Sequence, residues 1–190
     1  MEEKSHVKYY AIKLAVYVAI AVCIFIFREH LVCEETGKMI LNYFIGGLMT
    51  LYGVEEILFE IVFKDKHFWH KDKIYLGIIE ITFGIVMLCA PVDYETTCVV
   101  WATWSIVRES FEIKELVTEI KSWTLTILSG IESIAVIVLS VMLILEPHEH
   151  HALTHIYLLL IELVLTPLIP MLDEIIQEKK HKKQEEAKAE

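Results

Sequence analysis

Six long hydrophobic runs, separated by short polar segments, set the pattern of this chain. An α-helix rises 1.5 Å per residue, so roughly 20 apolar residues cross a hydrocarbon core of about 30 Å. The predicted membrane spans are residues 9–27, 39–63, 74–90, 98–116, 123–145 and 152–172. The fourth run becomes amphipathic after Ile106, a pattern that is also typical of a helix lying in the membrane interface.

The basic residues between the runs are divided very unequally between the two sides. If all six runs span the membrane, thirteen lysines fall on the side of both termini, and only Arg28 and Lys38 fall on the other side. Basic connections stay in the cytoplasm, so both termini are predicted to be cytoplasmic. If the fourth run did not cross, the basic KKHKK segment near the C-terminus would face outward, which favours six spans.

These features predict an all-α fold: an integral membrane bundle of six transmembrane helices in the cytoplasmic (inner) membrane. The spans pair along the chain as three helical hairpins, at about 9–63, 74–119 and 123–172. Residues 1–176 form the transmembrane domain. Residues 177–190 form a charged cytoplasmic tail, for which a solvated end is favoured over a tether.

Composition agrees with a membrane protein and excludes several other classes. Hydrophobic residues make up 55% of the 190 residues and the mean hydropathy is +0.51, too apolar for an ordinary soluble domain. The formal charge of −10 gives no reason to expect nucleic acid as a partner. No P-loop, dinucleotide-binding or zinc-protease motif occurs, so neither an enzyme nor a cofactor is predicted. The expected partners are membrane lipids, protons or cations, and a second copy in a homo-oligomer.

Short internal similarities favour a hairpin repeat. VEEILFEI at 54–61 resembles VRESFEI at 107–113, and GIIEI at 77–81 resembles GIESI at 130–134. With six short spans, prolines after two apolar helices (Pro91 and Pro147) and glycines inside the helices, the chain resembles the HdeD acid-resistance membrane protein family. The resemblance covers nearly the whole chain. It implies a non-enzymatic role in the acid or membrane stress response.

Ionisable residues inside the predicted spans are the main functional candidates. An ionisable side chain at the centre of a span costs about 2.5 to 3.5 kcal/mol, so these groups are expected to face the bundle interior. Counted along each helix from the cytoplasmic end, several reach a similar depth. The predicted intramembrane polar layer consists of Lys13, Glu55, Glu56, Glu60, Glu80, Arg108, Glu109, Glu112, Glu132 and Glu162.

Two interpretations of this layer stay open. Eight acids stand against two bases, so the unpaired carboxyl groups must be protonated, hydrated or bound to cations. In the first interpretation, the layer lines a hydrated vestibule that takes up protons or cations from the cytoplasm. In the second, it is a hydrogen-bonded network that fixes the packing of the helices, with Glu60 and Glu112 reaching toward the interface.

The sixth span and the outer connections add further candidates. Pro167 and Pro170, just after Glu162, are expected to kink or end the helix. The predicted outer, pH-responsive patch consists of His30, His148, His150, His151 and His155. Solvated histidines are an equal alternative. His151 and His155 are one helical turn apart and form a weak candidate for a metal site.

Two further hypotheses concern cysteines and aromatic residues. A Cys33 to Cys98 disulfide is considered for the outer face, and HFWH at 67–70 is expected to anchor at lipid headgroups rather than bind a partner.

The predicted function is therefore that of a small HdeD-like membrane protein in acid or membrane stress. The alternatives are a small proton- or cation-coupled transporter or channel that uses the carboxylate layer around Arg108, and a membrane scaffold.

Overall fold

The protein is a bundle of six α-helices. The computed structural model describes residues 3–62, 71–90, 92–118 and 122–189, and this part of the chain contains no β-strand. The helices are α1 (Glu3–Cys33), α2 (Glu35–Val62), α3 (Lys71–Cys89), α4 (Tyr94–Thr118), α5 (Trp123–Leu145) and α6 (Glu149–Ala189). The all-α prediction is therefore confirmed, and the predicted fifth span has the same bounds as α5.

Three of the six helices are long and apolar enough to cross a membrane by length and composition. They are residues Tyr10–Cys33 in α1, Trp123–Leu145 in α5 and Glu149–Lys180 in α6. Helices α2, α3 and α4 are not among these candidates in the described part of the chain. The chain is thus a helical protein with three candidate membrane spans.

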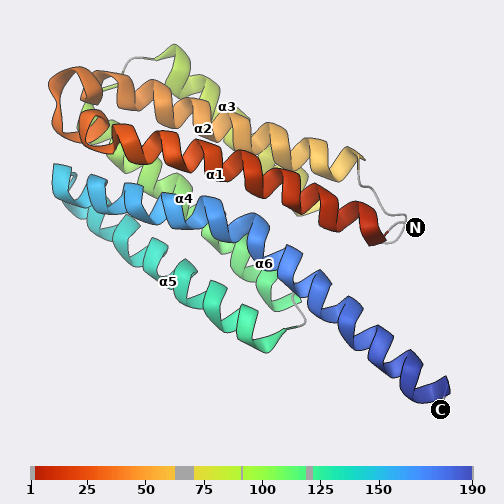
Figure 1. Cartoon of the computed structure of the whole chain (residues 1–190). Coiled ribbons are helices and arrows are strands. Elements are labelled where there is room, and N and C mark those ends of the chain that lie inside the picture. Colours follow the sequence, from red (N-terminus) through yellow and green to blue (C-terminus); the bar gives the residue numbers. More distant parts are fainter. Residues whose placement is uncertain (1–2, 63–70, 91, 119–121, 190) are drawn as a thin grey trace.

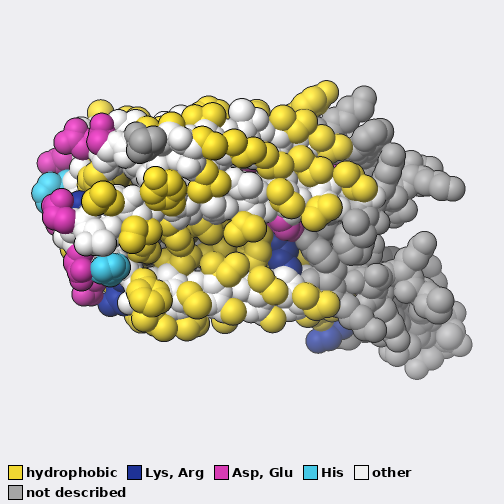
Figure 2. Space-filling view, turned by 90° about the horizontal axis from the view of Figure 1, so that it is seen from above, with side chains coloured by type: hydrophobic (Ala, Val, Ile, Leu, Met, Phe, Trp, Pro, Cys, Tyr) yellow, Lys and Arg dark blue, Asp and Glu magenta, His cyan; other side chains and the backbone are white. Residues whose placement is uncertain are grey.

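Hydrophobic side chains cover the outside of the bundle, as expected for a surface that faces lipid. Figure 2 shows them along the length of one face, with acidic and histidine side chains gathered at one end. Large exposed apolar residues occur on α1, α2, α3, α5 and α6, with Ile12, Ile61 and Ile131 each more than 60% exposed. An ordinary soluble protein avoids an apolar surface of this extent.

Helix α4 lies inside the bundle, which explains why it is the least apolar of the six predicted spans. Its only large exposed apolar residue among those described is Val117, whereas Trp101, Ala102 and Arg108 are buried. It packs on α5 and also contacts α2 and α3. Helix α4 thus packs against three other helices along its length.

The tightest packing in the fold is between α2 and α3, where glycines face glycines. A Cβ atom built on Gly53 would collide with the Gly77 carbonyl oxygen, and one built on Gly77 would lie 2.7 Å from the Gly53 carbonyl oxygen. Gly46 and Gly84 form a second close pair, two helical turns from the first. Small residues let membrane helices approach closely, as the sequence pattern indicated.

The most extensive helix contacts are not those between the two members of each predicted hairpin. Helix α2 packs most on α3, α1 on α6, and α4 on α5, while α1–α2, α3–α4 and α5–α6 contacts are smaller. Figure 1 shows the result: both termini lie at one end of the bundle, the α1–α2 and α5–α6 connections lie at the other, and α6 extends beyond its neighbours.

Helix α6 continues through Pro167 and Pro170, so the expectation that these prolines end the helix is wrong. Each proline removes one backbone donor and leaves the carbonyl four residues earlier without its helical bond. Those carbonyls belong to Leu163 and Thr166. The helix continues because Ile169 and Asp173 remain buried against the bundle, so tertiary packing offsets the lost hydrogen bonds.

Candidate functional site: a buried arginine–carboxylate cluster

Arg108 is the centre of a polar cluster inside the bundle. Its side chain is 2% exposed, and its Nε atom lies 2.9 Å from Glu112 Oε1 and 3.0 Å from Glu162 Oε1. A third carboxylate, Glu80 Oε1, lies 3.5 Å from Nη1. The guanidinium plane also stacks on the Tyr52 ring, 3.7 Å from its centroid. Helices α2, α3, α4 and α6 therefore meet at one cation.

Glu80 is held in this position from two sides. Trp104, one turn before Arg108 on α4, donates its indole N–H to Glu80 Oε1 at 3.0 Å. The Glu80 residue is fully buried, although α3 ends only nine residues later at Cys89. A charge-assisted hydrogen bond and an ion pair on the same oxygen fix this carboxylate toward α4.

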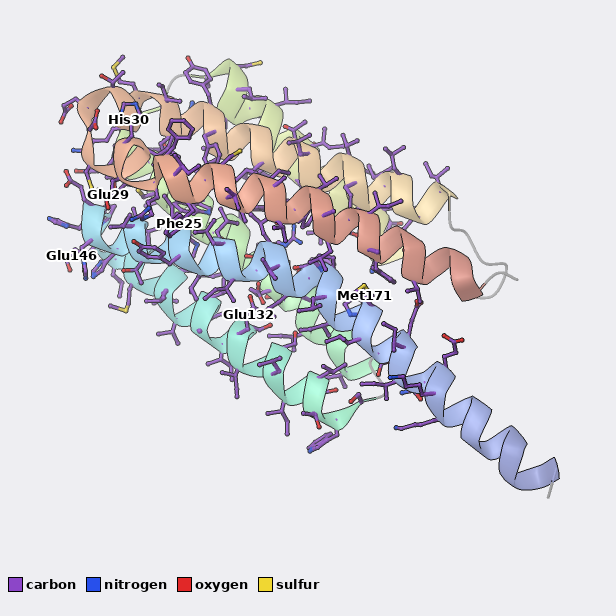
Figure 3. The ribbon with its side chains drawn as sticks, in the orientation of Figure 1. Phe25, Glu29, His30, Glu132, Glu146 and Met171 are labelled. Atoms are coloured by element: carbon purple, nitrogen blue, oxygen red, sulfur yellow. The ribbon has the colours of Figure 1, made fainter. Side chains whose placement is uncertain are left out.

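Glu109 and Glu132 extend the cluster toward α5. Glu109 is fully buried, and the Ser133 hydroxyl of α5 lies near its carboxylate, so at least one of the two oxygens accepts no hydrogen bond from a described residue. Glu132 of α5 is 9% exposed and lies close enough to Glu109 and Arg108 for direct electrostatic interaction. Figure 3 shows Glu132 about midway along α5, on the side that faces the bundle. The name Arg108 cluster is used below for Arg108, Glu80, Glu109, Glu112, Glu132 and Glu162.

Lys13 and Glu55 form a separate ion pair nearer the end that carries the termini. Lys13 Nζ lies 2.7 Å from Glu55 Oε1, and the Tyr17 hydroxyl donates to Glu55 Oε2 at 3.1 Å. The Tyr17 and Tyr52 rings pack edge to face with centroids 5.8 Å apart. The predicted layer is thus two polar groups joined by aromatic residues.

Two of the predicted residues lie outside both groups. Glu56 is half-buried near Lys13 and Lys73, one turn beyond Tyr52 on α2. Glu60 is 6% exposed and lies one turn further along the same helix. The structure therefore does not bring all ten predicted residues to one level.

The Arg108 cluster cannot be neutral through ion pairs alone. It contains five carboxyl groups and one guanidinium, and all six residues lie within the helices of the bundle. Uncompensated buried charge is expensive because the interior cannot solvate it as water does. The cluster must therefore bind protons, cations or both in order to balance its charge.

Four of the five predicted outer histidines lie at the end of the bundle opposite the termini. His30 lies 2.6 Å from Glu34, and His151 Nδ1 lies 3.0 Å from the Glu146 carbonyl oxygen. His148 and His150 are exposed at the α5–α6 connection, at the end of the bundle opposite the termini. Figure 3 shows Glu29, His30 and Glu146 together at this end of the bundle.

The assignment of His155 to the outer patch is wrong. His155 is 2% exposed, with its Nε2 atom 3.1 Å from Ser105 Oγ and its ring centroid 4.6 Å from that of Trp101. It lies on the buried face of α6, two turns before Glu162. The candidate His151–His155 metal pair is not formed, because the two imidazoles have these different partners.

An ion pair joins α2 to α6 at the end of the bundle opposite the termini, called the outer end below. Lys38 Nζ lies 2.6 Å from Glu149 Oε1. The hydrogen bond to Lys38 lowers the pKa of the Glu149 carboxyl, and the same bond raises the pKa of the Lys38 ammonium. Nearby, the Thr96 backbone N–H donates to Asp93 Oδ1 at 2.7 Å at the start of α4, which lowers the pKa of Asp93.

The structure does not contain the disulfide considered between Cys33 and Cys98. All four cysteines are free, with Cys98 buried and Cys33 exposed. The HFWH segment lies outside the described residues.

Several residues of the site were not predicted from the sequence, although the spacing of two of them along the chain indicates their position. Trp104 stands four residues before Arg108 and Tyr52 stands three before Glu55, and both spacings place side chains on one helical face. Ser105 and His155 come from different helices, so no spacing along the chain relates them.

Searches for similar proteins give no further assignment, because no family model, no curated protein and no solved structure matches this chain.

Proposed function

We propose that this protein is a six-span membrane protein that moves protons or cations across the cytoplasmic membrane by means of the Arg108 cluster. The observation that carries the proposal is the position of Arg108, 2% exposed and within 3.0 Å of two carboxylates from different helices. Ionisable residues inside a membrane bundle mark ion and proton pathways more often than they serve packing, since burial makes them expensive.

The proposed crossing of all six helices rests on how they pack. Helices α2, α3 and α4 lie alongside α1, α5 and α6, and the Lys38–Glu149 ion pair joins the α1–α2 end to the α5–α6 end. If α1, α5 and α6 span a membrane, helices packed along their length cross with them. The division of lysines between the two sides supports cytoplasmic termini.

The response to acid stress, expected from the HdeD resemblance, is proposed as the physiological setting. The outer end supports it, because acids and histidines such as Glu34 and His30 gather there beside few basic residues.

Proton flux into lipid vesicles tests the proposal. The full chain is reconstituted with a pH-sensitive dye inside, a pH step is applied, and the rate is recorded with and without a gradient of Na⁺, K⁺ or Mg²⁺. The wild type is expected to equilibrate pH faster than empty vesicles under at least one condition. The triple variant Glu80→Gln, Glu132→Gln, Glu162→Gln is expected to lose this flux.

The control is Glu95→Gln, which removes an exposed carboxylate at the start of α4. It should keep the wild-type rate. A wild type no faster than empty vesicles under every condition would overturn the proposal, as would a folded triple variant that retains full flux. Circular dichroism and gel filtration establish that each variant is folded.

A further inference from the structure

Three carboxylates of the Arg108 cluster converge on one point. Glu109 and Glu112 on α4 and Glu162 on α6 each present an oxygen, and these oxygens all lie within 4.8 Å of one another. This is the one group of three or more such ligands among the described residues. Glu109 and Glu112 are three residues apart, so they project from the same side of α4.

Glu109 provides an independent sign that this point receives a ligand. The residue is completely buried and its carboxylate reaches toward the other two. The nearby Ser133 hydroxyl on α5 can donate to at most one of its two oxygens, so at least one oxygen lacks a hydrogen-bond partner among the described residues. A buried carboxylate without a partner is unfavourable by several kcal/mol in general. A cation held between the three side chains would satisfy it.

We propose that Glu109, Glu112 and Glu162 form a binding site for one divalent cation of the hard, oxygen-preferring class, such as Mg²⁺, Ca²⁺ or Mn²⁺. Carboxylate oxygens are the ligands that these ions select, and the set contains no sulfur or imidazole ligand that would favour zinc or copper. This inference rests on the proposed function, because it names the substrate class of the same cluster.

The local charge agrees with a divalent ion. Three ionised carboxylates beside one guanidinium leave a net charge of −2, which one divalent cation neutralises when the other two carboxyl groups of the cluster, Glu80 and Glu132, are protonated. Glu112 is the least buried of the three ligands, with a side chain that is 24% exposed. It lies further along α4 toward the end that carries the termini, so the ion enters from that side.

Arg108 competes with the ion for the same atoms. Its Nε lies near Glu112 Oε1 and Glu162 Oε1, two of the ligand residues. The same guanidinium also lies 3.5 Å from Glu80 through Nη1 and stacks on the face of Tyr52, two contacts that the ion does not compete for. Arg108 is thus an internal cation that the bound ion displaces, which gives the site an exchange mechanism.

Binding of Mn²⁺ to the purified full chain tests this proposal. The chain is held in lipid nanodiscs, and free Mn²⁺ is measured by electron paramagnetic resonance, with Ca²⁺ and Mg²⁺ as competitors. We expect one site in the wild type. We expect Glu109→Gln to weaken the affinity by on the order of tenfold or more, because it removes one of three charged ligands. Arg108→Gln is expected to bind more tightly, because the competitor is gone.

The matched control is Glu55→Gln, which removes a partly buried carboxylate that pairs with Lys13 outside the site. It should bind as the wild type does. If Glu109→Gln does not fold, Glu109→Asp keeps the charge, shortens the side chain by one methylene, and is expected to bind more weakly than the wild type. Equal Mn²⁺ affinity in the wild type and a folded Glu109 variant overturns the inference.

The two proposals can fail separately. If the wild type binds no Mn²⁺ while the triple glutamine variant still abolishes proton flux, the cation site is wrong and the proposed function stands. If the wild type binds Mn²⁺ at this site but no vesicle condition shows flux, the site stands and transport is wrong.

Discussion

Arg108 shows how a single residue organises the interior of this bundle. It contacts Glu80, Glu112 and Glu162 and stacks on Tyr52, so four helices share one positive charge. Arginine suits this position better than lysine would, because its planar guanidinium group can bind several carboxylates and also stack on an aromatic ring. Removing one partner of a buried ion pair is more harmful than removing both, since it leaves an uncompensated charge.

Replacing Arg108 with glutamine should therefore destabilise the protein by on the order of 3 to 5 kcal/mol. Thermal or denaturant unfolding in detergent micelles measures this change. The control is Lys179→Gln, which removes an exposed cation near the end of α6. The double variant Arg108→Gln, Glu162→Gln is expected to be more stable than Arg108→Gln alone. Stability of Arg108→Gln equal to that of the wild type would contradict the central role of Arg108.

At the scale of elements, sequence spacing predicted which residues share a helical face but not which helices meet. The burial of Glu80, Glu109 and Glu162 was predicted, because hydrocarbon excludes charge. The packing of α2 on α3 and of α1 on α6 was not predicted, because the apolar surfaces of the helices differ little in sequence. His155 was misplaced because the sequence shows it near a loop, whereas α6 begins earlier, at Glu149, and turns it inward.

The α2–α3 contact gives a test with a matched control in the same helix. A methyl group at Gly53 collides with the Gly77 backbone, so Gly53→Ala should destabilise the protein by about 1 to 3 kcal/mol. Gly47 has nothing within 4 Å of an added Cβ, so Gly47→Ala should be neutral or stabilising by about 0.5 to 1 kcal/mol. Thermal unfolding of both variants in micelles checks this. Equal effects would show that the close approach is not present.

The Lys38–Glu149 ion pair predicts a pH dependence at the outer end. The pKa of Glu149 is lowered by Lys38, so the stabilisation is present above the ordinary carboxyl pKa of 4.5 and is lost as pH falls through the lowered value. The pKa of Lys38 is raised, so the loss at high pH begins only above its ordinary value of 10.5. The difference in thermal stability between the wild type and Glu149→Gln should be small, constant from about pH 5 to 10, and absent in strong acid. A difference that grows on acidification contradicts this pairing.

At the scale of the whole molecule, apolar side chains both fill the core and cover the outside of the bundle. Apolar side chains face outward on five helices, whereas the charged residues of the Arg108 cluster lie inside. Helix α4 carries much of this polarity and is shielded by the other helices. Its low hydropathy is compatible with this position, because few of its side chains face the outside. The hydropathy of a single helix does not show where that helix lies in the bundle.

The number of spans can be tested with cysteines. If all six helices cross, residues 33 and 146 lie on the same side of the membrane. If only α1, α5 and α6 cross, these two residues lie on opposite sides. A variant with Cys33 as its sole cysteine and one with Glu146→Cys as its sole cysteine are treated with a membrane-impermeant maleimide in oriented membranes. We expect both to be labelled from the outside, and a cysteine at Lys179 to be labelled only from the cytoplasmic side. Labelling of residues 33 and 146 from opposite sides would contradict the six-span bundle.

The most direct measurement of the central claim is infrared difference spectroscopy of the protein in lipid bilayers, with a chelator to remove divalent cations, over a series of pH values. We expect carboxyl bands that change with pH and lie in a poorly hydrated environment. These bands should shrink in Glu109→Gln and Glu132→Gln but not in Glu146→Gln. Carboxyl bands that change only in variants of exposed acids, with no contribution from Glu109 or Glu132 at any pH, would show that the buried cluster does not exchange protons.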